Sequence, residues 1–158
     1  HLYAYQDRVD GALHFALLRG QPTPDNPALV RVQVENTLSD LFGATAPDQT
    51  WSLKQALEEI GGSEADPACL IMLRQASDRD EVLARVREFQ ALARSGEMMP
   101  EPRSASEQSQ ALRTYGVGAQ ILTDLGIHRM RVLSSPKIMY GLSGFGIEVV
   151  DYVQSAGE

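Results

Sequence analysis

The chain has 158 residues, of which 43% are hydrophobic, and carries a formal net charge of −7 at pH 7. This length predicts one compact domain, and the acidic balance excludes a protein that holds nucleic acid or a membrane surface through clustered Lys and Arg. No apolar run approaches the roughly 20 residues of a membrane helix, and a single cysteine, Cys69, excludes an intrachain disulfide. We therefore expect a soluble, cytoplasmic protein in which Cys69 is a small core residue.

The first part of the chain predicts a β-hairpin and a third strand. Residues 2–5 and 13–18 are alternating or apolar runs on either side of a polar turn, which is a hairpin pattern. Three prolines within residues 21–28 predict a surface connection, after which residues 29–34 alternate as a strand. Because a strand pattern begins so early, we expect residues 1–158 to be a single domain cut from a longer polypeptide.

The middle of the chain predicts two helices around one buried strand. Residues 51–60 and 80–93 show the apolar spacing of a helix face, whereas residues 68–73 form the continuous apolar run of a strand buried on both faces. Residues 95–110 are rich in Ser, Pro, Glu and Gln, a composition that buries too little apolar surface to order itself. We expect residues 95–110 to form a mobile loop.

The last third of the chain alternates glycines with helical and apolar patterns. Residues 111–125 predict a helix that ends at Gly126, and residues 130–133 and 147–153 predict two strands. Strands that alternate with helices indicate βα units, so the sequence predicts the α/β class rather than a bundle or a sandwich.

Residues 112–150 carry the most specific pattern in the chain. They contain the phrases YGVGAQIL, DLG, RVL, PK and GFGIEVV, in that order. This order resembles the C-terminal half of GTP cyclohydrolase II, the riboflavin-pathway enzyme that opens the guanine ring of GTP. The resemblance implies a three-layer α/β domain with a mixed β-sheet flanked by helices, and it also implies a homodimer.

The resemblance places the family's zinc site on residues 31–50, where this chain departs from the family. In GTP cyclohydrolase II, three cysteine thiolates in this segment hold a zinc ion that activates the attacking water. An ungapped comparison puts Asn36, Pro47 and Gln49 at the cysteine positions, with Asp48 between two of them. Amides and one carboxylate are a poor zinc ligand set, and proline has no side-chain ligand. The sequence therefore predicts that zinc is absent and that this domain binds no cofactor.

Two further family motifs are altered. The family arginine that would meet a phosphate becomes Asp78, which repels anions, and a family tyrosine becomes Phe89. The family arginine that is thought to attack the α-phosphate is kept as Arg113, but the carboxylate two residues earlier is replaced by Ala111. Because an arginine is almost fully protonated, we expect Arg113 to be a vestigial catalytic residue.

Three other residues match nucleotide-site positions of the family: Arg31, Glu35 and Lys137. For each of them, and for Arg113, the resemblance implies a contact with the nucleotide, and the alternative is a structural or solvated side chain. Arg31 and Glu35 could also form an ion pair with each other, which at a surface contributes about 0 to 1 kcal/mol.

The sequence also suggests roles for one tryptophan, Trp51, and for two histidines, His14 and His128. The Trp51 ring either fills volume that zinc and nucleotide once occupied or packs in an ordinary core. Neither histidine has cysteine, histidine or carboxylate neighbours at ligand spacing, so we expect neither to bind a metal ion.

The leading interpretation is a catalytically inactive GTP cyclohydrolase II-like domain. By resemblance to two-domain riboflavin proteins, it would follow a 3,4-dihydroxy-2-butanone 4-phosphate synthase domain in one chain and serve as its dimerisation or regulatory module. Two alternatives stay open: an active cyclohydrolase that releases formate and pyrophosphate from GTP, and a sensor that binds a nucleotide or a flavin without converting it. GTP or a related nucleotide is therefore a candidate ligand, whereas nucleic acid and membrane are not expected partners.

Overall fold

The computed structural model describes residues 1–44, 51–62, 67–74, 105–136 and 141–155, together with single positions between residues 83 and 94. For residues 105–112 the backbone alone is described. Within this part of the chain, no helix combines the length and the apolar character needed to cross a bilayer.

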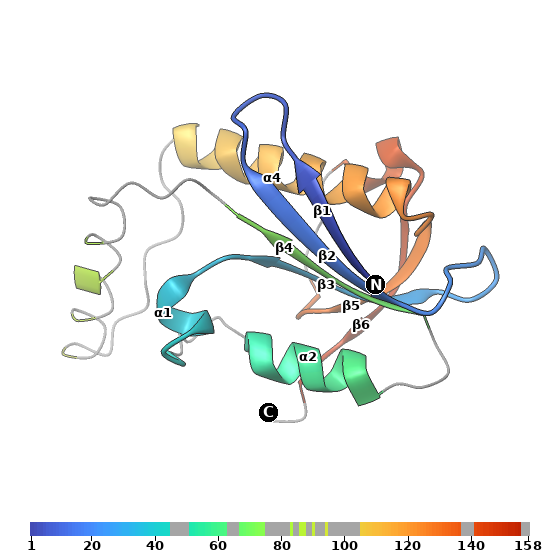
Figure 1. Ribbon diagram of the computed structural model, residues 1–158, viewed down its shortest axis with the longest axis horizontal. Helices are drawn as coiled ribbons and strands as arrows, with labels where there is room; N and C mark the ends of the chain where they lie inside the picture. The colour runs from blue at the N-terminus through green and yellow to red at the C-terminus, as the bar shows by residue number, and fades with distance from the viewer. Residues whose placement is uncertain are drawn as a thin grey trace.

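A mixed six-stranded sheet forms the centre of the molecule (Figure 1). Its strand order is β1-β2-β4-β3-β5-β6. The first two pairs in this order are antiparallel and the other three are parallel. The strands are Leu2–Gln6 (β1), Leu13–Arg19 (β2), Ala28–Val34 (β3), Ala68–Leu73 (β4), Arg129–Leu133 (β5) and Glu148–Val153 (β6). The predicted hairpin and the later predicted strands are thereby confirmed.

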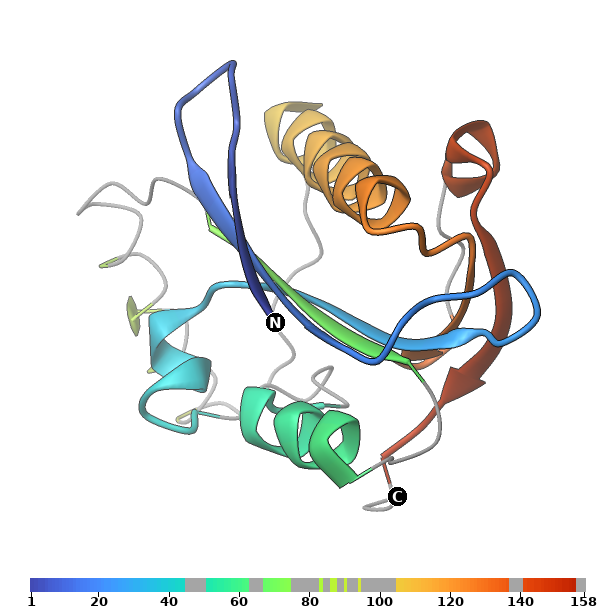
Figure 2. The same ribbon diagram turned by 45° about the vertical axis from the view of Figure 1, so that its right-hand side comes forward.

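Helices cover both faces of this sheet, so the three-layer arrangement is confirmed (Figure 2). The long helix α4 (Ala105–Asp124) lies on one face, and the helices α1 (Thr37–Asp40) and α2 (Leu53–Gly62) lie on the other. A short 3-10 helix, η1 (Leu142–Phe145), packs beside α4 and leads into β6.

The central strand β4 is buried on both faces and separates two hydrophobic cores. On the α4 side, Ile71 packs in one cluster with Leu122, and on the α2 side Leu70 packs in another with Ile60. Cys69 belongs to the α4-side core and has no exposed surface, which confirms its prediction as a core residue. Burial raises the pKa of the Cys69 thiol to about 12.

Helix α4 begins earlier than the sequence pattern predicts. Residues 105–110, assigned above to a mobile loop, are helical and form the first turns of α4, and residues 95–104 lie outside the described residues. This segment contains Ala, Glu and Gln, which favour helix even where no apolar stripe marks one. At the other end the prediction holds, because Gly126 adopts the left-handed φ of +74° that glycine takes without strain.

The two predicted helices in the middle of the chain differ in how much of them the structure describes. The helix predicted at residues 51–60 is α2, which begins and ends two residues later. Of the helix predicted at residues 80–93, the described positions have helical backbone: Leu83, Val86, Arg87 and Gln90.

Candidate functional site

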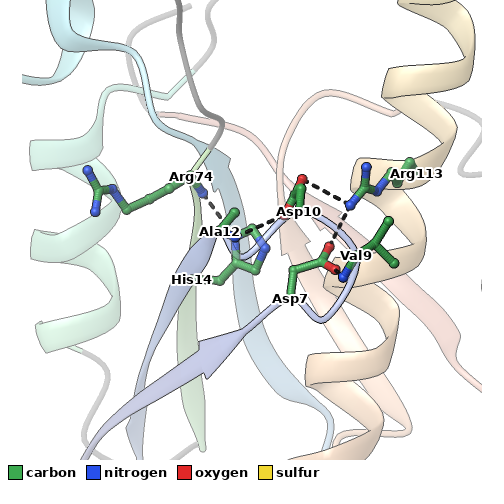
Figure 3. A network of polar contacts seen from close by, with 7 residues as sticks. All are labelled: Asp7, Val9, Asp10, Ala12, His14, Arg74 and Arg113. Atoms are coloured by element: carbon green, nitrogen blue, oxygen red, sulfur yellow. Dashed lines mark hydrogen bonds and ion pairs between the residues drawn. The ribbon is translucent and has the colours of Figure 1, made fainter.

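The carboxyl ends of β3 and β4 lie side by side, because these strands are parallel and Val34 is paired with Leu73. The residues that follow, Glu35 and Arg74, therefore leave the sheet at the same edge. In open α/β sheets, ligands bind at the carboxyl ends of the strands. The turn between β1 and β2 and one part of α4 also come to this edge, where charged side chains gather (Figure 3).

Glu35 forms its ion pair with Arg74. The Nε atom of Arg74 lies 2.6 Å from Oε2 of Glu35, and the two side chains are 48% and 37% exposed. Glu35 therefore pairs with Arg74 and not with Arg31, whose guanidinium binds other groups, as described next. A pair with this much exposure contributes only about 0 to 1 kcal/mol to stability.

The guanidinium of Arg31 is held inside the protein. Its Nη1 donates to the Leu133 carbonyl at 2.7 Å, and its Nε and Nη2 donate to Oε1 of Gln33 at 3.1 and 2.8 Å. Nη2 also donates to the Trp51 carbonyl at 3.4 Å. Burial lowers the pKa of Arg31, and the Asp40 carboxylate opposes that shift. These contacts join β3 to β5 and to the segment at Trp51, which favours the structural interpretation of Arg31.

Asn36, at the first of the family's cysteine positions, is the N-cap of α1. Its Oδ1 accepts hydrogen bonds from the backbone N–H groups of Leu38 at 3.1 Å and Ser39 at 3.5 Å. Its backbone is extended, as an N-cap residue requires. The Asp40 carboxylate closes the same turn, since its Oδ2 accepts from the Asn36 backbone N–H at 2.8 Å. The side-chain oxygen that could approach a cation is thus engaged with backbone donors.

Asn36→Ala is expected to lower the free energy of unfolding by about 1 kcal/mol, because it removes a helix cap. Asn36→Ser keeps a capping oxygen and should lie within about 0.5 kcal/mol of the unsubstituted chain. Urea unfolding followed by circular dichroism measures both variants. Equal losses for alanine and serine would show that capping is not what Asn36 contributes.

A group of charged side chains joins the β1–β2 turn to α4 (Figure 3). Nη2 of Arg113 lies 3.0 Å from Oδ2 of Asp7 and 2.9 Å from Oδ2 of Asp10. Each aspartate also accepts a backbone N–H within the turn, Asp7 from Val9 at 2.7 Å and Asp10 from Ala12 at 2.9 Å. The turn therefore holds both carboxylates toward α4.

This arrangement fixes the charge of Arg113. The hydrogen bond with Asp7 raises the pKa of Arg113, and the charge of Asp10 adds to the shift. A guanidinium with a raised pKa stays protonated, and a protonated guanidinium is not a nucleophile. The geometry therefore supports an ion pair between the hairpin and α4 rather than a reactive side chain.

The stability of the chain should depend on pH through Asp7. The backbone N–H of Val9 lowers the pKa of Asp7 below its ordinary value of 3.8, and the Arg113 hydrogen bond lowers it further. Such a carboxylate contributes stability that is fully present above its unfolded-state pKa and is lost as the pH falls through the folded-state pKa. We expect the advantage of the unsubstituted chain over Asp7→Asn to shrink between about pH 5 and pH 2. Urea midpoints across this range test the expectation, and an advantage that grows in acid would contradict it.

His14 is buried behind this charged group, with 6% of its surface exposed. Its Nδ1 accepts the backbone N–H of Arg74 at 3.1 Å, so the neutral ring carries its proton on Nε2. Nε2 faces the side on which Asp7 and Asp10 lie, and it has no hydrogen-bond partner in the described part of the chain (Figure 3). Burial lowers the pKa of His14, although the two aspartates oppose the shift. His128, by contrast, is exposed.

The described residues do not fit a zinc ion of the family's kind. Asn36 is an amide that already caps a helix, and among the described residues no three His, Cys, Asp or Glu side chains lie close enough together to hold a metal ion. Six residues named in the sequence predictions lie outside the described ranges: Pro47, Asp48, Gln49, Asp78, Phe89 and Lys137. The predictions made for these six residues stay predictions.

The sequence gives no role at this edge to three of its residues: Asp7, Asp10 and Arg74. The two aspartates lie in a polar turn, where such residues are ordinary turn formers. Their pairing with Arg113 becomes visible only once the hairpin is placed beside α4. The Glu35–Arg74 pair likewise follows from the parallel pairing of β3 with β4, which no local pattern states.

Comparisons with known proteins agree with this fold. A family model described as GTP cyclohydrolase II matches residues 1–154. A 3,4-dihydroxy-2-butanone 4-phosphate synthase of Pseudomonas aeruginosa is 36% identical over 153 residues, which are 97% of this chain and 39% of that protein. A protein of the same name from Photobacterium phosphoreum is 35% identical over 98% of this chain and 39% of its own length.

A third relative carries a different name. The riboflavin biosynthesis protein RibBA of Bacillus cytotoxicus is 33% identical over 97% of this chain and 38% of its own length. The chain thus spans about two fifths of the length of these curated relatives.

Proposed function

Since this chain belongs to the GTP cyclohydrolase II family, we propose that it is a member that has kept the fold and lost the catalytic centre. The chain is a GTP cyclohydrolase II-like domain related to proteins of the riboflavin pathway. In this proposal the domain does not open the guanine ring of GTP and instead supports a neighbouring domain.

The observation that carries the proposal is the use of Asn36 as a helix cap. Zinc in this family requires thiolates, whereas the Asn36 oxygen accepts two backbone N–H groups at the start of α1. Arg113 supports the same conclusion, because the arginine that the family keeps is paired here with Asp7 and Asp10. A side chain held in this way has no free lone pair with which to attack a phosphate.

The proposed setting is a longer protein in which a 3,4-dihydroxy-2-butanone 4-phosphate synthase domain precedes this one. Relatives that carry the synthase name are about two and a half times as long as the segment they share with this chain. In that setting the domain acts as a dimerisation or regulatory module, and the whole protein is a cytoplasmic homodimer.

Turnover of GTP tests the loss of catalysis. The purified chain, supplied with GTP and with magnesium and zinc salts, is expected to release no formate above a heat-denatured sample. A family member with three cysteines serves as the positive control. Release of formate and pyrophosphate would instead establish an active cyclohydrolase. Protection from thermal unfolding by millimolar GTP, without turnover, would favour the sensor alternative, because a ligand that binds only the folded state raises apparent stability.

Deletion of the domain from the full-length gene product tests its role as a module. We expect deletion either to convert a dimer into monomers or to lower the synthase kcat/KM several-fold. Sedimentation and a synthase assay measure the two effects. An unchanged mass per particle together with an unchanged kcat/KM would contradict the module role while leaving the loss of cyclohydrolase activity standing.

A further inference from the structure

One face of the β1–β2 hairpin is apolar and uncovered. Leu2 and Leu17 pair directly across the two strands and so share a face, and Leu13 lies on the same face of β2. These leucines are 68%, 41% and 45% exposed, respectively. On the opposite face, Ala16 and Leu18 are buried in the core beneath α4. Helix α2 packs against β3 and β4 and leaves the hairpin leucines exposed.

A cavity of about 470 Å³ lies at one end of this face. It is lined by His1, Leu17, Leu18, Arg19, Gly20 and Ile60. The Nε and Nη2 atoms of Arg19 are buried, yet in the described part of the chain they have no hydrogen-bond partner. Burying guanidinium N–H groups without an acceptor is unfavourable. An anion from a binding partner would accept these N–H groups and remove that cost.

The start of the chain lies beside this cavity. The His1 amino group donates to the Leu18 carbonyl at 2.8 Å, and the Leu18 N–H donates to the His1 carbonyl at 2.9 Å. His1 thus extends the antiparallel ladder, and a residue preceding His1 would lie opposite Arg19. A domain joined ahead of His1 would therefore enter at the cavity.

We infer that the hairpin face, defined by Leu2, Leu13, Leu17 and Arg19, docks the synthase domain joined ahead of residue 1. That domain contributes apolar side chains to the leucines and one carboxylate to Arg19. A carboxylate is the partner that a guanidinium binds with two parallel hydrogen bonds, and the apolar surroundings strengthen the pair. Docking also covers β1, which is one of the two edge strands of the sheet. The inference rests on the proposed function, because it requires an attached domain.

Arg19→Met tests whether Arg19 pairs with a carboxylate of the synthase domain. The test compares the change in Tm in the 158-residue chain with the change in the full-length gene product. In the 158-residue chain, the substitution removes a partly buried guanidinium of which two nitrogen atoms lack an acceptor, so the Tm should be unchanged or rise by about 3 °C. In the full-length gene product, the same substitution leaves a buried carboxylate unpaired, so the Tm of this domain should fall by about 3 °C or more. Arg8→Met, at the other end of the hairpin and exposed, is the matched control and should change neither Tm.

Hydrogen exchange provides a second measurement that does not depend on Arg19. Residues 2–6 should exchange about tenfold more slowly in the full-length product than in the 158-residue chain, because docking covers the edge strand. Leu2→Lys should remove this difference. Val9→Lys, which alters a side chain that is 82% exposed in the turn, should leave it in place.

The possible failures can be told apart. If Arg19→Met has the same effect in both proteins, or if residues 2–6 exchange equally in both, the docking inference is overturned while the proposed function stands. If the 158-residue chain dimerises and Arg19→Met dissociates it, the occupant of this face is a second copy and the inference is overturned. If the gene product has no synthase domain, the proposed two-domain setting fails and the docking inference fails with it, whereas the proposed loss of cyclohydrolase activity stands.

Discussion

Trp51→Ala is expected to lower the free energy of unfolding by about 3–5 kcal/mol. The Trp51 ring is 4% exposed and belongs to the core between the sheet and α2, together with Leu29, Ala56 and Leu133. Its Nε1–H donates to the Val153 carbonyl at 3.0 Å and so joins the start of α2 to the last strand. Alanine removes these packing contacts and leaves the carbonyl without its donor. The structure thus places the Trp51 ring in a hydrophobic core.

Circular dichroism during urea unfolding measures the effect, because Trp51 is the single tryptophan and its replacement removes the indole fluorescence. Trp51→Phe keeps a ring but loses the hydrogen bond, and it should cost about 1–2 kcal/mol. Phe42→Ala, at a side chain that is 77% exposed, is the matched control and should stay within about 0.5 kcal/mol. A loss below about 1 kcal/mol for Trp51→Ala would contradict the core role.

Arg31→Met is expected to lower the free energy of unfolding by about 3 kcal/mol, because it leaves buried acceptors unpaired. The Leu133 carbonyl would lose a hydrogen bond of 2.7 Å, and the Gln33 side chain, which is 6% exposed, would lose both of its guanidinium donors. Leaving a buried polar group unpaired costs about 1–3 kcal/mol, and more than one group is affected here. Methionine matches the arginine stem in shape, so the change isolates the hydrogen bonds.

Arg129→Met is the matched control for Arg31→Met. Arg129 pairs with Glu148 at 3.0 Å, with side chains 41% and 63% exposed, so its removal should cost less than about 1 kcal/mol. Urea unfolding at pH 7 measures both variants. If both variants lose a similarly small free energy of unfolding, the hydrogen bonds of Arg31 do not stabilise the fold. That result would favour the interpretation of Arg31 as a retained nucleotide contact.

The strands could be predicted because apolar runs bounded by turn residues specify them locally. The clearest case is β4, whose continuous apolar run predicts a strand buried on both faces, and the structure has it at Ala68–Leu73. The start of α4 could not be predicted in the same way. Its first residues are polar helix formers whose composition matches that of mobile segments, and they are ordered as part of a long helix.

The candidate site was predictable only in part, because its contacts depend on topology. The departure from the family at Asn36 is visible in the sequence, but its use as an N-cap depends on where α1 begins. The sequence names Arg113 as a kept arginine, yet its partners lie in the hairpin turn, far away along the chain. Glu35 pairs with Arg74, the residue that follows the neighbouring strand β4, and not with Arg31 of the strand before it.

Zinc binding tests the central claim most directly, since the claim is that the fold persists without the family's metal centre. The untagged chain is dialysed to equilibrium against micromolar zinc beside a family member that has three cysteines, and the metal in each protein is determined by elemental analysis. The account predicts that the family member retains one zinc per chain and that this chain retains far less than one. One zinc per chain, shown by X-ray absorption to be tetrahedral, would contradict it.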